Sequence, residues 1–300
     1  MKVNKCYKYV LSLGHLCSDI NQSILSAVLP FLIATYHYDY TTAAMLVTVS
    51  NVFGSFVQPF IGMLSDKKNK PLYMTLGVLL ASGGMAVTGF ISNFFGLCIA
   101  VIISGIGVAM FHPQAAKLVN SVSSKNAKGK GMSIFSFGGK IGFTLGPVYT
   151  AFLMNLFGMK GTILFLIPGI VFGIVCSFFN KDFENLDVLE VEKKEEVKSE
   201  QKDEWGGFIK LCGVVFSRSI LSNGISTFLA LYFIQQFSKS NSFASMILSV
   251  FYGIGSIATL LGGGIADRFG HRKMVRLSFC IFLPAIFIFT NTSHFVIALI

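Results

Sequence analysis

Gly62-Met-Leu-Ser-Asp66-Lys67-Lys68-Asn69-Lys70 is a short cationic stretch between two apolar runs, and a degenerate copy of it recurs far along the chain. The copy reads Gly263-Gly-Ile-Ala-Asp267-Arg268-Phe-Gly270-His271-Arg272-Lys273. One offset of 201 residues relates the two leading glycines and also the two aspartates, and a base follows each aspartate. The chain is therefore predicted to be internally duplicated.

Both copies are predicted to form loops that join membrane-spanning helices. Glycine permits a tight turn, an aspartate is stabilised at a helix N-terminus, and bases face anionic lipid headgroups. Two positive loops that only follow topology rules are the simpler alternative. The residues expected to act in these gating loops are Gly62, Asp66, Lys67 and Lys70 in the first copy and Gly263, Asp267, Arg268 and Arg272 in the second.

The composition excludes a soluble protein. Hydrophobic residues make up 53% of the chain and charged residues 13%, and the mean hydropathy is +0.68. Such a chain has too little polar surface for a soluble globule and is typical of a polytopic membrane protein. Its net charge of +10 is assigned to cytoplasmic loops rather than to a nucleic-acid groove.

Enzymatic chemistry and a metal centre find no support in the sequence. The six cysteines stand singly in apolar runs, without the paired spacing of a disulfide framework or a zinc site. No nucleophile with an adjacent base, no cluster of metal ligands and no phosphate-binding loop is recognised. We therefore expect a protein that is not an enzyme and that carries no cofactor and no metal.

Apolar runs of about 20 residues, the length that crosses a bilayer, recur along the chain. They fall near residues 7–36, 42–64, 71–91, 94–119, 131–156, 161–180, 207–236, 243–265 and 274–291, and a tenth begins near 294. The first run follows three lysines, as in a signal peptide, but it contains His15 and Asp19 and lacks a cleavage site, so we interpret it as a retained span. This pattern predicts an all-α polytopic membrane protein.

The basic residues predict the orientation of these helices. Assigning loops to alternate sides places 20 of the 24 Lys and Arg on the side of the N-terminus, and only Lys160 and Lys239 on the other side. By the positive-inside rule the N-terminus is cytoplasmic. We expect a monomeric, multi-pass protein of the plasma membrane.

A polar stretch divides the helices into two groups. Residues 181–206 hold ten of the fourteen acids and five lysines, which is typical of a solvated cytoplasmic linker. It separates a six-helix bundle at 1–180 from an incomplete bundle at 207–300, which holds spans seven to nine and the start of ten. Because the second repeat stops early, we expect a C-terminally truncated chain that inserts into the membrane without transporting.

Polar residues inside the membrane mark candidate functional groups, because ionisable groups are costly there. In the first span Ser12, His15, Asp19, Gln22 and Ser26 recur at steps of three and four residues and form one stripe. The stripe is predicted to line an aqueous path, with Asp19 as its only carboxylate. The alternative is that Asp19 only hydrogen-bonds a neighbouring helix.

The fourth span ends in Met110-Phe111-His112-Pro113-Gln114, where the proline leaves a backbone carbonyl unpaired near the histidine. Together with His15-x3-Asp19-x2-Gln22-Ser23, Ser133-Ile-Phe-x2-Gly138-Gly139 and Leu145-Gly146-Pro147, this stretch resembles the fosmidomycin-resistance branch of the major facilitator superfamily. The repeated cationic stretch is likewise similar to the loops after the second and eighth helices of that superfamily.

The resemblance implies a drug efflux protein driven by protons, with two helix bundles that rock around a central site. One position departs from the branch: Gln114 stands where a glutamate is typical, so a proton-exchanging role is not carried over to it. The residues assigned to the substrate or proton pathway are His15, Asp19, Gln22, His112, Gln114, Lys140 and Arg218.

The fifth span carries a face of small residues. Gly138, Gly142 and Gly146 recur at steps of four before Pro147 and predict close contact with another helix. This pattern resembles the glycine-rich fifth-helix motif of antiporters in the superfamily. Lys140 is predicted to project away from the glycines, toward a cavity or a partner charge; snorkelling to the lipid surface is the alternative.

Arg218 lies deep in the seventh span, one of the helices that line the central cavity in the resembled family; a buried pair between the bundles is the alternative. Lys140 and Arg218 outnumber Asp19, so the cavity is predicted to be cationic and the substrate to be a small anion such as a phosphonate. Protons are the expected coupling ion. An uptake symporter of a small organic solute and a non-transporting remnant are the other hypotheses.

Overall fold

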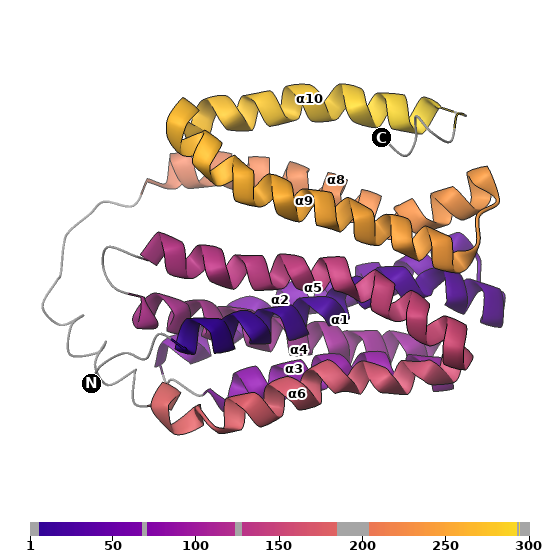
Figure 1. The fold of residues 1–300 in the computed structure, drawn as a ribbon, viewed down its shortest axis with the longest axis horizontal. Helices are drawn as coiled ribbons and strands as arrows, with labels where there is room; N and C mark the ends of the chain where they lie inside the picture. Colours follow the sequence, from indigo (N-terminus) through magenta and orange to yellow (C-terminus); the bar gives the residue numbers. More distant parts are fainter. Residues whose placement is uncertain (1–5, 68–70, 124–127, 185–203, 293, 295–300) are drawn as a thin grey trace, which may run out of the picture.

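The computed structural model describes residues 6–67, 71–123, 128–184, 204–292 and 294, and this part of the chain is built from helices without a β-strand. The helices run side by side along the longest axis of the molecule (Figure 1). They are α1 (Tyr7–Tyr36), α2 (Tyr40–Lys67), α3 (Leu72–Ala86), η1 (Val87–Phe90), α4 (Phe94–Val122), α5 (Lys128–Phe157), η3 (Gly158–Phe165), α6 (Leu166–Ser177), α8 (Trp205–Phe237), α9 (Asn241–Phe269) and α10 (His271–Asn291).

Eight helical segments within the described residues are long and apolar enough to cross a membrane. One of them, Gly131–Ser177, is a continuous stretch that contains most of α5 together with η3 and α6. The predicted all-α membrane architecture is therefore confirmed, and the predicted spans differ from the helices by a few residues at their ends. The tenth span, expected from residue 294, falls outside the described residues.

The two cationic stretches that were expected to be loops are largely helical. Helix α2 continues through Gly62 to Lys67, and α9 continues to Phe269. A sharp turn then occurs at Gly270, whose φ of 92° is a conformation that glycine adopts readily. The described side chains do not include those of Asp66, Lys67, Asp267 and Arg268, and Lys70 lies outside the described residues altogether.

Helix α1 is the central element of the N-terminal group, α1 to α6, and its closest neighbour is α5. A Cβ atom added to Gly138 would lie 2.2 Å from the Ser12 backbone oxygen, and one added to Gly142 would lie 2.5 Å from the Leu16 backbone oxygen. At Gly146 it would lie 1.9 Å from Ser23 Oγ. The predicted glycine face is therefore the surface on which α5 packs against α1, as small residues allow in membranes.

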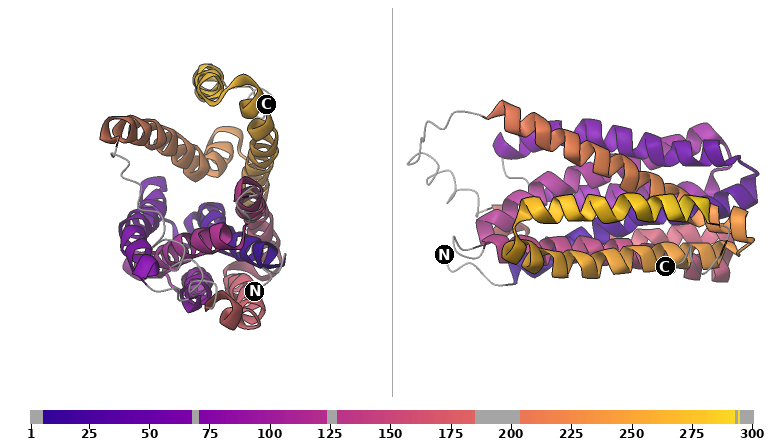
Figure 2. Two further views of the ribbon diagram at one scale, coloured as in Figure 1. Left: turned by 90° about the vertical axis from the view of Figure 1, so that its left-hand side faces the viewer. Right: turned by 90° about the horizontal axis from the view of Figure 1, so that it is seen from above.

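The helices α8 and α10 stand apart from α1 to α6 over much of their length, whereas α9 packs along α5, with hydrogen bonds to α5 at positions from Ser242 to Ser256 (Figure 2). At one end the two groups share an apolar cluster in which Ala27 of α1 packs with Leu229, Phe233 and Ile247. Polar bonds join the same end: Ser245 Oγ donates to Ala27 O at 3.0 Å. The groups are thus closed at the end of the molecule that holds the α8–α9 turn.

Most of the predicted linker, residues 185–203, lies outside the described residues. Its first residues are helical, and the Phe183 ring is fully buried in a cluster with Tyr7. The Tyr7 hydroxyl donates to Asp182 Oδ2 at 3.0 Å. The start of this polar stretch therefore packs on the cytoplasmic end predicted for α1 instead of extending into solvent.

Candidate functional site

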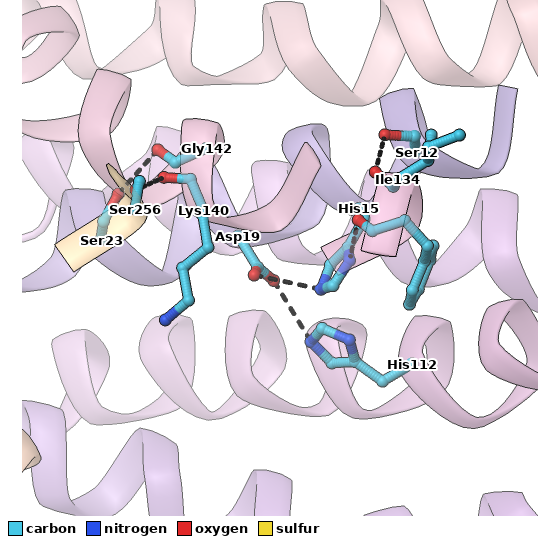
Figure 3. A network of polar contacts seen from close by, with 10 residues as sticks. Ser12, His15, Asp19, Ser23, His112, Ile134, Lys140, Gly142 and Ser256 are labelled. Atoms are coloured by element: carbon cyan, nitrogen blue, oxygen red, sulfur yellow. Dashed lines mark hydrogen bonds and ion pairs between the residues drawn. The ribbon is translucent and has the colours of Figure 1, made fainter. Parts of the chain in front are cut away.

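Three ionisable side chains from two helices converge in the N-terminal group (Figure 3). His15 and Asp19 lie one turn apart on α1, with His15 Nε2 3.2 Å from Asp19 Oδ2. His112 reaches them from α4, with its Nε2 3.3 Å from Asp19 Oδ1. The two imidazole rings meet edge to face at a centroid distance of 5.1 Å. We call these three residues the His–Asp cluster.

A backbone carbonyl determines the tautomer of His15. The Nδ1 atom lies 2.8 Å from Phe135 O, and because a carbonyl only accepts hydrogen bonds, Nδ1 must carry the hydrogen. In a neutral ring Nε2 then has only a lone pair, which would face the Asp19 carboxylate. A positive charge between Nε2 and Oδ2 would remove this repulsion. The simplest such charge is a proton that the two side chains share.

The Asp19 carboxylate is buried, with 5% of the residue exposed. Its Oδ1 atom lies close to His112 but accepts no hydrogen bond of acceptable geometry. A buried carboxylate is stable only when its charge is compensated and its oxygens are satisfied. The two histidines are the compensating groups among the described residues, and they leave one oxygen open.

Helix α5 approaches the cluster through a glycine that sequence reasoning did not single out as a site residue. A Cβ atom added to Gly139 would lie 2.5 Å from Asp19 Oδ2 and 2.6 Å from His15 Nε2. A side chain at this position would collide with the pair, so a glycine is needed for α5 to approach Asp19 and His15 this closely. Only the adjacent glycines in the sequence hint at this close approach.

Lys140 is the cation nearest to the cluster along α5. Its side chain extends from α5 toward α4, into the region of Asp19, in Figure 3. No ion pair involves its ammonium group within the part of the chain that the structure describes. Lys140 is therefore available to a charge that approaches from outside the cluster.

A cavity of about 450 Å³ lies between the two groups of helices and reaches His112. Residues from α1, α2, α4, α5, α8 and α9 line it. The amide side chains in its wall are Asn21, Gln22, Asn51, Gln58 and Asn223, and the hydroxyl side chains are Ser26, Ser50, Ser55, Ser104, Ser226, Thr227 and Tyr252. The wall thus offers many neutral donors and acceptors, and His112 connects it to the His–Asp cluster.

The structure brings some of the predicted pathway residues together and leaves others apart. Gln22 and His112 line the cavity, and His15 and Asp19 lie directly behind His112. Gln114 is fully buried and is not part of the cavity wall. Arg218 is exposed on α8 and does not line the cavity. Lys140 does not line the cavity either, so the predicted cationic lining is not formed in this conformation.

Sequence reasoning missed the polar face of α2. Asn51, Ser55 and Gln58 recur at steps of four and three residues and line the cavity. The same spacing had identified the stripe on α1, so a usable signal was present. Tyr252 offered no comparable signal, because its place in the wall depends on where α9 packs.

Comparison with known proteins connects this geometry to a family. The sequence profile described as Major Facilitator Superfamily matches residues 11–300. The fosmidomycin resistance protein of Escherichia coli (strain K12) is 23% identical over 269 residues, which cover 88% of this chain and 66% of the relative. Multidrug resistance protein MdtG of Proteus mirabilis (strain HI4320) is 24% identical over 236 residues, covering 76% and 58%. The chain thus spans no more than 66% of either relative.

Solved structures share the same arrangement of helices. A bacterial homologue of the human lysosomal transporter Spinster, in an inward-facing and occupied conformation, matches with a TM-score of 0.78 at 17% sequence identity. The match covers 99% of this chain and 70% of the other. At this level of identity the likeness concerns the fold.

Proposed function

Because the chain belongs to the Major Facilitator Superfamily, we propose that it works in a secondary active transporter that couples proton movement to the export of a small polar compound. The observation that carries this proposal is the His–Asp cluster at the wall of the cavity between the two groups of helices. A site near the membrane midplane, between two groups that move against each other, is the arrangement that alternating access requires.

The cluster is suited to hold and release a proton. With His15 Nδ1 committed to the Phe135 carbonyl, a proton at Nε2 or Oδ2 is needed to make the His15–Asp19 contact favourable. His112 contacts both Asp19 and the cavity, so it is the route by which this proton exchanges with water. A change in the number of bound protons alters the contact between α1 and α4, which links protonation to helix movement.

The names of the relatives favour export over uptake. One is a fosmidomycin resistance protein and another a multidrug resistance protein. An uptake symporter is the second candidate, because the same groups serve either direction; transport assays in vesicles of opposite orientation distinguish the two. The excess of bases near residues 67–70, 117–130 and 268–276 favours a cytoplasmic N-terminus. In that orientation the described conformation is closed at the outer end.

A crosslink at the closed end tests alternating access. Ser242 Oγ of α9 donates to Asn155 Oδ1 of α5 at 2.5 Å, so Asn155→Cys and Ser242→Cys place two thiols across the contact. In a background without the native cysteines, crosslinking should reduce transport to the background level, and reduction of the crosslink should restore it. Transport that continues at full rate after complete crosslinking would contradict the proposed motion.

We propose that the substrate is a small anion such as a phosphonate. Lys140, rather than Arg218, is the cation that we expect to bind it. Neither cation lines the cavity, but Lys140 extends toward Asp19, whereas Arg218 is exposed on α8. A charge-assisted hydrogen bond contributes about 1.5–3 kcal/mol, so Lys140→Gln should weaken phosphonate export roughly tenfold or more. Arg218→Gln is the matched control and should have little effect.

Resistance to a phosphonate, measured at equal membrane abundance of the complete protein and its variants, gives the readout. A hydrophobic quaternary ammonium dye serves as the opposite probe and should not be exported. If Lys140→Gln leaves phosphonate resistance intact, or if the parent protein exports the dye strongly, the substrate is not an anion. The neutral amides and hydroxyls of the wall would then define the substrate as a neutral polar compound.

A further inference from the structure

Three potential metal ligands, His15, Asp19 and His112, converge from two helices in the His–Asp cluster. We propose that the His–Asp cluster binds a divalent transition-metal ion of the zinc type. His15 Nε2 lies 3.2 Å from Asp19 Oδ2, and His112 Nε2 lies 3.3 Å from Asp19 Oδ1. Zinc bonds to nitrogen and oxygen ligands are about 2.0–2.2 Å long, so two ligands at a tetrahedral angle lie about 3.4 Å apart, close to both of these separations.

The ligand set matches this class of ion. Two imidazole nitrogens and one carboxylate lie within 4.8 Å of one another, and imidazole with carboxylate is a set that Zn²⁺ and Co²⁺ prefer. Zinc sites with three protein ligands keep a further position for water or substrate. His112 lies at the wall of the cavity, which provides both the route of entry and the water.

The hydrogen bonds around the cluster are more specific evidence for a metal site than the number of ligands is. Histidines that bind metals commonly donate their second ring N–H to a backbone carbonyl, which orients the ligating nitrogen. His15 Nδ1 has this bond to Phe135 O, and its Nε2 faces Asp19. The Asp19 Oδ1 atom, buried and without a hydrogen bond, is a further acceptor that an ion would satisfy.

Lys140 opposes the binding of a cation. Its ammonium group lies in the same region as Asp19, so its positive charge should lower the affinity without removing a ligand. One substitution can therefore distinguish metal binding from anion transport. Replacement of Lys140 by the uncharged Met should tighten metal binding, whereas the same replacement should weaken transport of an anion.

Metal binding is independent of the proposed transport function and is measured without transport. The experiment uses the purified chain in detergent, with any affinity tag removed and without added substrate. Co²⁺ is added as the spectroscopic probe, and Zn²⁺ is then used to displace it. We expect visible absorption bands of Co²⁺ bound to nitrogen and oxygen ligands, saturation at one ion per chain, and loss of the bands when Zn²⁺ is added.

Matched variants locate the site. Asp19→Asn and His112→Gln each remove a ligand and should weaken binding by more than about 100-fold, the upper range for loss of an outer-shell partner. Gly139→Ala keeps all three ligands but places a methyl group against Asp19 and His15, and should also weaken binding. His112→Cys supplies another zinc ligand and should retain Zn²⁺. His37→Asn is the control, since His37 lies in the turn after α1, away from the cluster.

The Co²⁺ titration and the variants can each contradict the proposed metal site. Absence of Co²⁺ bands at millimolar metal overturns the inference and leaves a proton as the occupant of the cluster. Binding that survives in Asp19→Asn and disappears in His37→Asn also overturns it, because the metal would then be at the surface. Thermal unfolding of each variant without metal checks that it is folded, and Zn²⁺ should raise the midpoint of the parent but not of Asp19→Asn.

Discussion

Asp19→Asn is expected to abolish transport that is driven by a proton gradient, while substrate binding and substrate exchange persist. Asparagine has nearly the shape of aspartate but cannot bind or release a proton near neutral pH. The carboxylate is the buried acceptor that both histidines contact, and its removal leaves no acid in the cluster. Substrate exchange needs only the movement of the two groups of helices around the cavity, so it should survive.

The measurement uses the complete protein in liposomes, with an imposed pH gradient in one assay and substrate on both sides in the other. Gradient-driven uptake should fall to the level of empty liposomes. His37→Asn, in the turn after α1, is the control and should transport normally. If Asp19→Asn accumulates substrate as well as the parent does, another group carries the proton, and His15 or His112 would be examined next.

Replacement of Gly142 on α5 is expected to destabilise the protein strongly. A Cβ atom at this position would lie 2.5 Å from the Leu16 backbone oxygen and 3.0 Å from the Ile20 backbone nitrogen. Backbone atoms of a packed helix cannot move aside as a flexible side chain can, so α1 and α5 must separate. Gly142→Ala should therefore destabilise the protein by about 1–3 kcal/mol, and Gly142→Leu by more.

Gly83→Ala is the matched control, because nothing lies within 4 Å of a Cβ atom added to this glycine of α3. Alanine is favoured over glycine in a helix by up to about 1 kcal/mol, so this change should be neutral or stabilising. Unfolding in a denaturing detergent, followed by the change in helicity, compares the variants. Equal stability of Gly142→Ala and the parent would show that α1 and α5 are less closely packed than described.

The positions of the helices could be predicted from the sequence because a membrane span obeys a local rule. An apolar run of sufficient length has to become a helix in lipid, where its own backbone groups must bond to each other. The two cationic stretches were predicted to be loops, but they are largely helical, and the same rule explains the difference. Gly62 is compatible with a helix, so α2 continues to Lys67, and α9 ends only near Gly270, where φ is positive.

Part of the site followed from the same periodicity. The stripe on α1 contains His15, Asp19 and Gln22, and the glycines on α5 predicted a close helix contact. Their spacing in one helix determines that they share a face, whatever the rest of the chain does. The assignment of the chain to its family came from these motifs as well, and it is confirmed by the match over residues 11–300.

The meeting of side chains from different helices was decided by the tertiary structure alone. His112 reaches Asp19 because α4 packs beside α1, and Phe135 O and Gly139 reach His15 because α5 does. Arg218 is a deep residue by sequence but exposed in the fold, since its part of α8 stands apart from the other helices. Periodicity within a helix says which residues share a face, and only packing determines which face of another helix they meet.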